Sequence, residues 1–390
     1  MTKIYQRPIQ ELAGLTYPCS CGRTHRVDIQ AIRVGSGCLA ELPDILRRLG
    51  ANRVFLLADN HTFAAAGRRV EDLLQQGGIP YHIHLFESKA PLVPNEYALG
   101  SALAAMEAED DLLLAVGSGT LNDLTKYLSA RTGIPYVIAA TASSMDGYAS
   151  TVAPLILDGV KTTLPAVYPA AILADVEILK DAPMPMLTAG FGDIIGKYTA
   201  LCDWRLSCEL FGEYYCEEAV ILMEQALEKC AGNAKALAQR DPAAVEAVTE
   251  ALILSGVAMG LVGNSRPASG AEHHMAHYWE MDALRRGEEH PLHGNAVGAS
   301  AVISASLYEL AAAQLPQGFR PPDKGRIIAC LQDAGAAASP KELGIRKDLC
   351  MEALLHAMKL RDRFTILRFL DSKGLLTACA LELTNRFYGT

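Results

Sequence analysis

Five of the ten histidines lie in one short stretch in the second half of the chain. The segment AEHHMAHYWEM holds His273, His274 and His277, and HPLHGNAVG holds His290 and His293. His273 and His277 are four residues apart, a spacing that puts two side chains on one face of a helix. A solvated histidine face would explain any one of them. Five so close together favour a bound metal ion, since imidazole is a common metal ligand.

A carboxylate of matching chemistry lies earlier in the chain. The segment GFGDIIGKYTALCDW places Asp193 in a mostly apolar helical pattern. A carboxylate is costly to bury unless it is paired or bound to a metal, although capping of a helix start would also account for it. A catalytic divalent ion needs three protein ligands and one open position. Asp193 and two histidines meet that number, and such a donor set suits zinc, nickel or ferrous iron.

A glycine turn, Gly117-Ser118-Gly119-Thr120, joins the apolar run LLLAV to a helical pattern. Glycines let the backbone approach a pyrophosphate, and the helix N-terminus offers free N–H groups and a favourable dipole. The turn matches neither G-x-G-x-x-G nor a P-loop, so an ordinary strand-to-helix turn is the alternative. Asp123, four residues after Gly119, either orders this loop or lies on the helix face.

Asp59 ends an earlier apolar run, VFLLAD. A carboxylate at the end of a strand can accept a hydrogen bond from an adenine-ribose hydroxyl and repel a 2′-phosphate. A turn-forming aspartate is the alternative. The cofactor expected from these two features is NAD or NADP.

The elements that must position these residues change character along the chain. Short apolar runs (NRVFLLADN, YHIHLFE, DLLLAVG, PYVIAATASS) alternate with helical patterns over the first 160 residues. This rhythm predicts a mostly parallel sheet covered by helices. After a proline-rich stretch the pattern is helical to the end. We therefore predict an α/β nucleotide-binding domain over residues 1–165 and an all-helical metal and substrate domain over 166–390, with the active site in the cleft between them.

The composition narrows the possible partners. The formal net charge is -9, which argues against nucleic acid or an anionic membrane as the main partner. The first residues contain no apolar stretch typical of a signal peptide. We expect no run to approach the roughly 20 apolar residues of a membrane span. These features predict a cytoplasmic protein with a small-molecule substrate.

Ten cysteines without a signal peptide indicate reduced thiols. Most of them, Cys216 included, lie in apolar patterns where a small buried hydrophobe is expected. Cys19, Cys21 and His25 cluster in PCSCGRTH. Zinc sites usually have four ligands and a C-x₂₋₄-C spacing, so a local turn with free thiols is favoured here over a structural metal.

Several stretches together resemble a known superfamily. AVGSGTLND, TASSMDGYAS, GFGDIIGKYTALCDW, SRPASGAEHHMAH and LHGNAVG are similar, in this order, to the iron-type (group III) alcohol dehydrogenases and dehydroquinate synthases. Within that superfamily the bacterial glycerol-1-phosphate dehydrogenases are the most similar. SRPASGAEH with TASSMDGYAS is the more specific pair, whereas the glycine turn alone is not specific. The resemblance implies a Rossmann-like N-terminal domain, a helical C-terminal domain and a homo-oligomer, often a homodimer.

The resemblance also implies roles for individual residues. It places the metal ligands at Asp193, His273 and His293, with Lys197 where longer-chain relatives carry a fourth ligand. His277 falls where related dehydrogenases keep a second histidine near the substrate. Asp146 falls where the family meets substrate and nicotinamide, so Asp146 and His277 are the expected catalytic residues. The expected cofactor-binding residues are Asp59, Gly117, Ser118, Gly119, Thr120, Asp123, Thr141, Ser144 and Ser150.

The implied reaction is the reversible reduction of dihydroxyacetone phosphate to sn-glycerol 1-phosphate with NAD(P)H. The implied metal, zinc or nickel ahead of iron, would act as a Lewis acid on the substrate oxygen. For the phosphate, Arg266 is the first expectation because a guanidinium fork matches phosphate oxygens. Lys161 and Lys197 come next, and a surface arginine in a loop is the alternative for Arg266. Glycerol dehydrogenase and a dehydroquinate-synthase-like cyclase are the alternative functions; resemblance to the cyclase would put Glu where this chain has Asp193.

Overall fold

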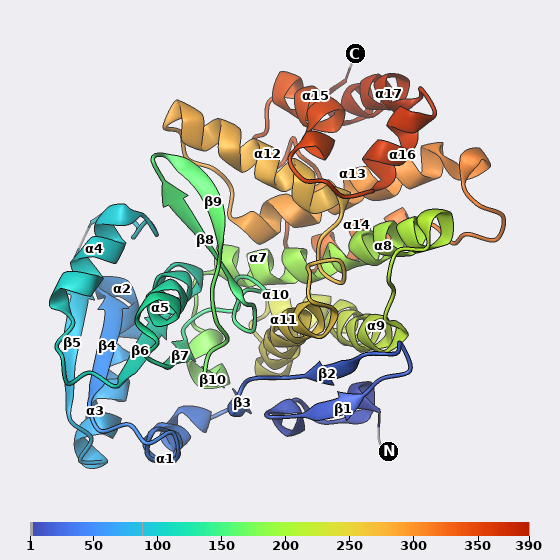
Figure 1. The fold of residues 1–390 in the computed structure, drawn as a ribbon. Helices are drawn as coiled ribbons and strands as arrows, with labels where there is room; N and C mark the ends of the chain where they lie inside the picture. Colours follow the sequence, from blue (N-terminus) through green and yellow to red (C-terminus); the bar gives the residue numbers. More distant parts are fainter. Residues whose placement is uncertain (1–2, 88, 390) are drawn as a thin grey trace.

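The computed structural model describes residues 3–87 and 89–389, in which an α/β half leads into a helical half (Figure 1). The central sheet is parallel, with strand order β3-β10-β7-β6-β4-β5. Its strands span Ala31–Gly35 (β3), Ala171–Asp175 (β10), Tyr136–Ala140 (β7), Leu112–Gly117 (β6), Val54–Asp59 (β4) and Tyr81–Phe86 (β5). β4, β6, β7 and β10 are almost entirely buried, as expected for parallel strands covered on both faces.

Helices connect these strands in the predicted rhythm. α1 (Leu42–Arg48), α3 (Arg68–Gln76), α4 (Glu96–Ala105) and α5 (Gly119–Thr132) separate consecutive strands of the sheet. α3 is amphipathic and buries Val70 and Leu74 against the sheet. α5 ends at Gly133, whose φ of 76° is the left-handed conformation that glycine adopts at no steric cost. The predicted α/β architecture of this half is confirmed.

The sheet extends past the predicted domain boundary at residue 165. β10 lies between β3 and β7, so the α/β half reaches Asp175. The sequence pattern also did not predict the antiparallel hairpin of β8 (Val152–Leu157) and β9 (Val160–Pro165). Asp158 and Gly159 form its turn with φ of 51° and 75°, as a two-residue hairpin loop requires. This hairpin contacts α5 and α12 (Figure 1), and Lys161 of β9 forms an ion pair with Glu280 of α12.

The second half is helical, as predicted. Its main helices are α7 (Met184–Ile195), α8 (Lys197–Phe211), α9 (Glu217–Gly232), α11 (Pro242–Val262), α12 (Ala271–Arg286), α13 (His293–Leu310), α14 (Lys324–Asp333), α15 (Lys347–His356), α16 (Ile366–Ser372) and α17 (Leu376–Tyr388). The largest hydrophobic cluster joins Ile138 of β7 to Leu252 of α11, so the two halves share one core. A second hairpin, β1 (Thr16–Pro18) with β2 (Thr24–Arg26), packs near α9 and α11 rather than on the main sheet (Figure 1).

One helix contradicts the expectation that no segment approaches the length and apolarity of a membrane span. Among residues 3–87 and 89–389, α11 alone is long and apolar enough to cross a membrane by length and composition. In the fold, 72% of that apolar window is buried inside the protein, where α11 packs on α7 and α9. α11 is therefore a core helix.

Candidate active site

Two glycines allow α7 and α13 to pack closely. A Cβ atom on Gly192 would lie 2.4 Å from the carbonyl oxygen of Gly294, and one on Gly294 would lie 1.8 Å from the carbonyl oxygen of Ala189. No side chain larger than hydrogen fits at either position. This close approach brings Asp193, near the end of α7, beside His293, the first residue of α13.

The three predicted metal ligands come together at this helix contact. The ligand atoms of Asp193, His273 and His293 all lie within 4.8 Å of one another. His273 Nε2 is 3.5 Å from Asp193 Oδ1, and the rings of His273 and His293 have centroids 5.3 Å apart. His293 Nδ1 is buried without a hydrogen-bond partner in the part of the chain that the structure describes. An oxygen and two nitrogen ligands that converge in this way fit a divalent ion.

Glu272 fixes the orientation of His273. Its Oε1 atom lies 2.9 Å from His273 Nδ1, and Thr199 Oγ1 donates a hydrogen bond of 2.7 Å to its Oε2 atom. With Nδ1 held by a carboxylate, Nε2 is left to face Asp193, an arrangement that often accompanies metal-bound histidine. Burial would raise the pKa of Glu272, but the hydrogen bonds from His273, Thr199 and the Gly270 N–H, together with the charge of His273, lower it. No pattern in the sequence predicts this role, although Glu272 directly precedes His273.

Lys197 balances two carboxylates beside the predicted ligands. Its Nζ atom lies 2.7 Å from Asp193 Oδ1 and 2.8 Å from Asp146 Oδ2, and its side chain is fully buried. Ser255 Oγ donates to the same oxygen of Asp146 at 2.8 Å. Burial alone would raise the pKa of Asp193, but Lys197, His273 and His293 together hold it well below its usual range. Lys197 is thus committed to Asp193 and Asp146, which argues against its predicted role as a phosphate ligand.

A cavity of ≈ 200 Å³ lies beside the histidines. It is lined by Lys161, Thr163, His274, His277, Met281, Leu360 and Arg361. The ring of His277 stacks on that of His293, with centroids 5.0 Å apart. Burial, with the positive charges of Lys161 and Arg361, lowers the pKa of His277 to about 3, although Glu280 opposes this shift. His277 is therefore a neutral imidazole at the cavity wall at pH 7.

Two cationic side chains face this cavity. Lys161 Nζ is 2.6 Å from Glu280 Oε2, so a carboxylate already shares its charge. Arg361 Nη2 lies 3.4 Å from His277 Nε2, and no ion pair to Arg361 is seen within residues 3–87 and 89–389. Burial lowers the pKa of Arg361. A half-buried guanidinium without a carboxylate partner is suited to an anionic ligand. Arg361 was not among the residues predicted from the sequence.

Glu280 offers an alternative ligand set. Its carboxylate oxygen comes within 4.8 Å of the ligand atoms of His277 and His293. Burial would raise the pKa of Glu280, yet Lys161 and His277 hold it well below the usual range. We favour Asp193 over Glu280 because the Asp193 side chain is completely buried and its partner His273 has the supporting carboxylate of Glu272.

Arg266 lies elsewhere, contrary to the first expectation for the phosphate. Its guanidinium donates to both carboxylate oxygens of Glu213, to the carbonyl oxygen of Phe364 and to Ser207 Oγ. These bonds occupy most of its donors, and the residue is buried. Arg266 therefore fastens the end of α8 to the segment before α16, and the prediction that it binds phosphate is wrong for this geometry.

The glycine turn and Asp59 lie at neighbouring strand ends. Gly117 ends β6 and Asp59 ends β4, and the two strands pair directly. The connection after β4 runs to β5 on one side, whereas the connection after β6 runs to β7 on the other. Ligands of open parallel sheets bind at such a switch in direction. Asp59 also caps α2 (Asn60–Thr62) by accepting from the N–H groups of His61 and Thr62.

The remaining predicted cofactor residues surround this strand edge. Ser118 is the N-cap of α5 and Thr120 lies in its first turn, while the N–H of Thr141, just after β7, donates to the carbonyl oxygen of Gly117 at 3.0 Å. Ser144 lies three residues further along the same loop.

Asp123 and Ser150 both contact Lys126, which the sequence analysis missed. The fully buried Lys126 Nζ lies 3.0 Å from Asp123 Oδ1 and 3.1 Å from Ser150 Oγ, and it also donates to the carbonyl oxygen of Gly147. This network ties α5 to the loop before β8. The i, i+3 spacing of Asp123 and Lys126 was a signal for it.

Comparisons with known proteins identify a matching family and similar folds. Residues 33–183 match the iron-containing alcohol dehydrogenase family. The maleylacetate reductase of Agrobacterium tumefaciens superposes with a TM-score of 0.70 at 18% identity, covering 92% of this chain and 95% of that one. The glycerol dehydrogenase of Schizosaccharomyces pombe superposes with a TM-score of 0.69 at 15% identity, covering 92% and 91%. At these identities the likeness concerns the fold.

Relatives of higher identity specify the family. The chain is 38% identical over 368 residues to a glycerol-1-phosphate dehydrogenase of Bacillus velezensis, covering 90% of this chain and 93% of the relative. It is 35% identical over 339 residues to the enzyme of that name from Methanosarcina acetivorans, covering 86% and 89%. With this identity over nearly the full length, the chain belongs to the glycerol-1-phosphate dehydrogenase family of NAD(P)-dependent oxidoreductases.

Proposed function

We propose that this protein catalyses the reversible reduction of dihydroxyacetone phosphate to sn-glycerol 1-phosphate with NADH or NADPH. The observation that carries the proposal is the position of the Asp193, His273 and His293 cluster beside a cavity with cationic walls. The names of relatives at 35–38% identity support it.

The three-ligand site fits a divalent ion, one per subunit. Zinc and nickel are our first choices and iron the third, since one carboxylate and two imidazoles suit all three. A bound ion there supplies a Lewis acid for the substrate's carbonyl or alcohol oxygen. Glu272 and Lys197 support the ligands by orienting His273 and by balancing the charge on Asp193.

The reaction adds a hydride to the carbonyl carbon and a proton to the carbonyl oxygen, and NAD(P)H becomes NAD(P)+. We assign to His277 the relay of this proton, because its ring stacks on that of His293 at the cavity wall. The neutral ring accepts the alcohol proton in the oxidative direction, and in the reductive direction it passes on a proton taken up from solvent. Asp146 acts as a positioning residue in this scheme. Its main-chain N–H donates to Asp193 Oδ2 at 3.2 Å, and its carboxylate is fixed by Lys197 and Ser255.

The substrate phosphate is assigned to Arg361, with Lys161 in support. Both line the cavity, and among the described residues the guanidinium of Arg361 has no carboxylate partner. A guanidinium forms strong, often bidentate hydrogen bonds with phosphate. His274 lines the same cavity, and neither of its buried ring nitrogens has a hydrogen-bond partner in the described part of the chain.

The dinucleotide is assigned to the strand ends at Asp59 and Gly117. Ser118, Gly119, Thr120, Thr141 and Ser144 surround its expected path, while Asp123 and Ser150 order the loop through Lys126. We further propose a cytoplasmic homodimer, without nucleic acid or membrane insertion, in line with the net charge of -9.

The test is a coupled measurement of substrate preference and product. Purified protein is supplied with NADH or NADPH and with dihydroxyacetone phosphate or dihydroxyacetone, and the product is offered to an enzyme specific for sn-glycerol 3-phosphate. We expect rapid oxidation of the nicotinamide with the phosphorylated substrate and a product that the second enzyme leaves unchanged. Preference for dihydroxyacetone would support glycerol dehydrogenase instead. Phosphate-substrate turnover without net consumption of the nicotinamide would support a cyclase.

A further inference from the structure

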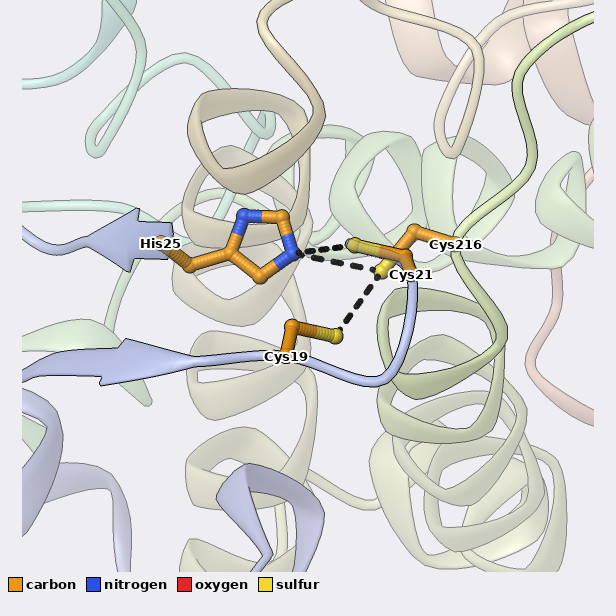
Figure 2. A group of neighbouring side chains, drawn as sticks. All are labelled: Cys19, Cys21, His25 and Cys216. Atoms are coloured by element: carbon orange, nitrogen blue, oxygen red, sulfur yellow. Dashed lines mark hydrogen bonds between the residues drawn. The ribbon is translucent and has the colours of Figure 1, made fainter. Parts of the chain in front are cut away.

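A second cluster of ligand-type side chains lies far from the active-site histidines, at the N-terminal hairpin. Cys19 follows β1, Cys21 lies in the turn of the hairpin, and His25 is the middle residue of β2. Cys216 joins them from the N-cap position of α9, 197 residues after Cys19. Figure 2 shows the three sulfur atoms and one imidazole nitrogen turned toward a common centre.

The spacing of these atoms matches a tetrahedral zinc site. Zinc–sulfur bonds of about 2.3 Å and zinc–nitrogen bonds of about 2.0 Å, at tetrahedral angles, separate two sulfurs by about 3.8 Å and a sulfur from a nitrogen by about 3.5 Å. Cys19 Sγ and Cys216 Sγ are 3.8 Å apart. His25 Nε2 lies 3.3 Å from Cys21 Sγ and 3.4 Å from Cys216 Sγ. All four ligand atoms lie within 4.8 Å of one another.

The surroundings of the cluster are those of a closed site. Cys19, His25 and Cys216 are buried, and an apolar cluster that includes Trp204 and Val220 packs around the two buried thiols. None of the cysteines forms a disulfide. The thiols of Cys21 and Cys216 both approach the single atom His25 Nε2, and the thiol of Cys19 approaches that of Cys216. One imidazole nitrogen has a single lone pair, so it cannot satisfy both thiols by ordinary hydrogen bonds.

Neighbouring groups are placed as outer-sphere supports. Tyr214 OH donates to Cys21 Sγ at 3.2 Å, and the guanidinium of Arg23 lies 3.5 Å from the centre of the Tyr214 ring. His25 also has a hydrogen bond to the main chain of Leu261. Such partners fix the orientation of metal-bound histidine and thiolate.

We propose that Cys19, Cys21, His25 and Cys216 form a structural zinc site, separate from the proposed catalytic metal. Thiolate-rich sets select zinc over harder cations, and four protein ligands leave no open position for a substrate. The ion would fasten the β1–β2 hairpin to the start of α9. The expectation of a simple turn with free thiols failed to include Cys216, because that ligand is distant in sequence and lies in an apolar pattern.

The test is a measurement of zinc content and sulfur ligation in the purified full-length protein. Zinc X-ray absorption should show sulfur scatterers at about 2.3 Å, which the oxygen and nitrogen ligands of the active site cannot produce. Cobalt added to metal-free protein should give a thiolate-to-cobalt charge-transfer band. Neither readout depends on catalysis, so failure of the zinc proposal can be distinguished from failure of the proposed function.

Variants locate the site. Cys216→Ser and the less buried Cys21→Ser should each lose one zinc per chain, lose the cobalt band and unfold at a lower temperature. Cys230→Ser is the matched control, because Cys230 is equally buried on α9 but its thiol donates to the carbonyl oxygen of Ala247, away from the cluster. This variant should keep both the zinc and the band. Absence of sulfur-bound zinc in the wild-type protein after zinc addition would overturn the proposal. So would a Cys19–Cys216 disulfide in the purified protein, or unchanged zinc in Cys216→Ser.

Discussion

Arg361→Ala should weaken binding of the phosphorylated substrate selectively. Arg361 lines the active-site cavity, and no carboxylate partner for it is seen within the described residues. Losing hydrogen bonds to a charged group costs about 1.5–3 kcal/mol. At about 1.4 kcal/mol per factor of ten, KM for dihydroxyacetone phosphate should rise roughly tenfold to more than a hundredfold. Lys161→Ala should have a smaller effect, because Glu280 lies 2.6 Å from the Lys161 ammonium and already shares its charge.

The assay compares KM and kcat for dihydroxyacetone phosphate and for unphosphorylated dihydroxyacetone. The ratio between the two substrates cancels general damage to the enzyme. Arg346→Ala serves as the control. Arg346 is a partly exposed arginine outside the cavity, and its Nε atom lies 3.2 Å from Asp348 Oδ1. An equal rise of KM for both substrates, or no rise for the phosphorylated one, would refute the assignment of Arg361 to the phosphate.

Three further changes test the cofactor and metal positions. Asp59→Asn keeps an N-cap residue for α2 but removes the negative charge, so steady-state kinetics should show a shift in preference from NADH toward NADPH. An equal loss of activity with both cofactors would mean that Asp59 serves only the fold. Gly119→Val should weaken the nicotinamide more than the substrate, because a branched side chain would crowd the expected pyrophosphate path and Met145, whose Cγ would lie 3.3 Å from a Cβ. Unchanged dinucleotide affinity in a titration would mean that the glycine turn has only a structural role. Glu272→Gln should reduce metal affinity by about 10–100-fold, because the carboxylate no longer fixes the orientation of His273. A titration in metal buffers measures this affinity, and an unchanged value would contradict the prediction.

Local patterns in the sequence were sufficient to predict most elements of the α/β half. Runs such as VFLLAD and LLLAVG became β4 and β6, because buried parallel strands are continuously apolar. The β8–β9 hairpin was missed, since its exposed residues show weaker apolar alternation and its turn, Asp158-Gly159, was not used as a signal. β10 was placed in the wrong half because strand order depends on long-range pairing with β3 and β7.

In the candidate site, too, local patterns predicted some residues, whereas long-range contacts hid others. Asp193, His273 and His293 were found from residue type and from resemblance, and the fold brings them together. Arg266 was misassigned because its partner Glu213 is fifty-three residues away in sequence, where no local pattern reveals the ion pair. Cys216 was missed as a partner of Cys19 for the same reason: nothing near it in sequence marks it as a ligand.

The central claim is that a divalent ion on Asp193, His273 and His293 enables reduction of dihydroxyacetone phosphate. The most direct measurement is the rate of NAD(P)H oxidation by chelator-treated protein, before and after addition of zinc, nickel or iron one at a time, with Asp193→Ala in parallel. We predict no turnover without metal, recovery with zinc or nickel in the wild-type protein, and neither metal uptake at this site nor recovery in the variant. Full turnover by metal-free protein, or an Asp193→Ala protein that still takes up the ion and recovers, would contradict the account.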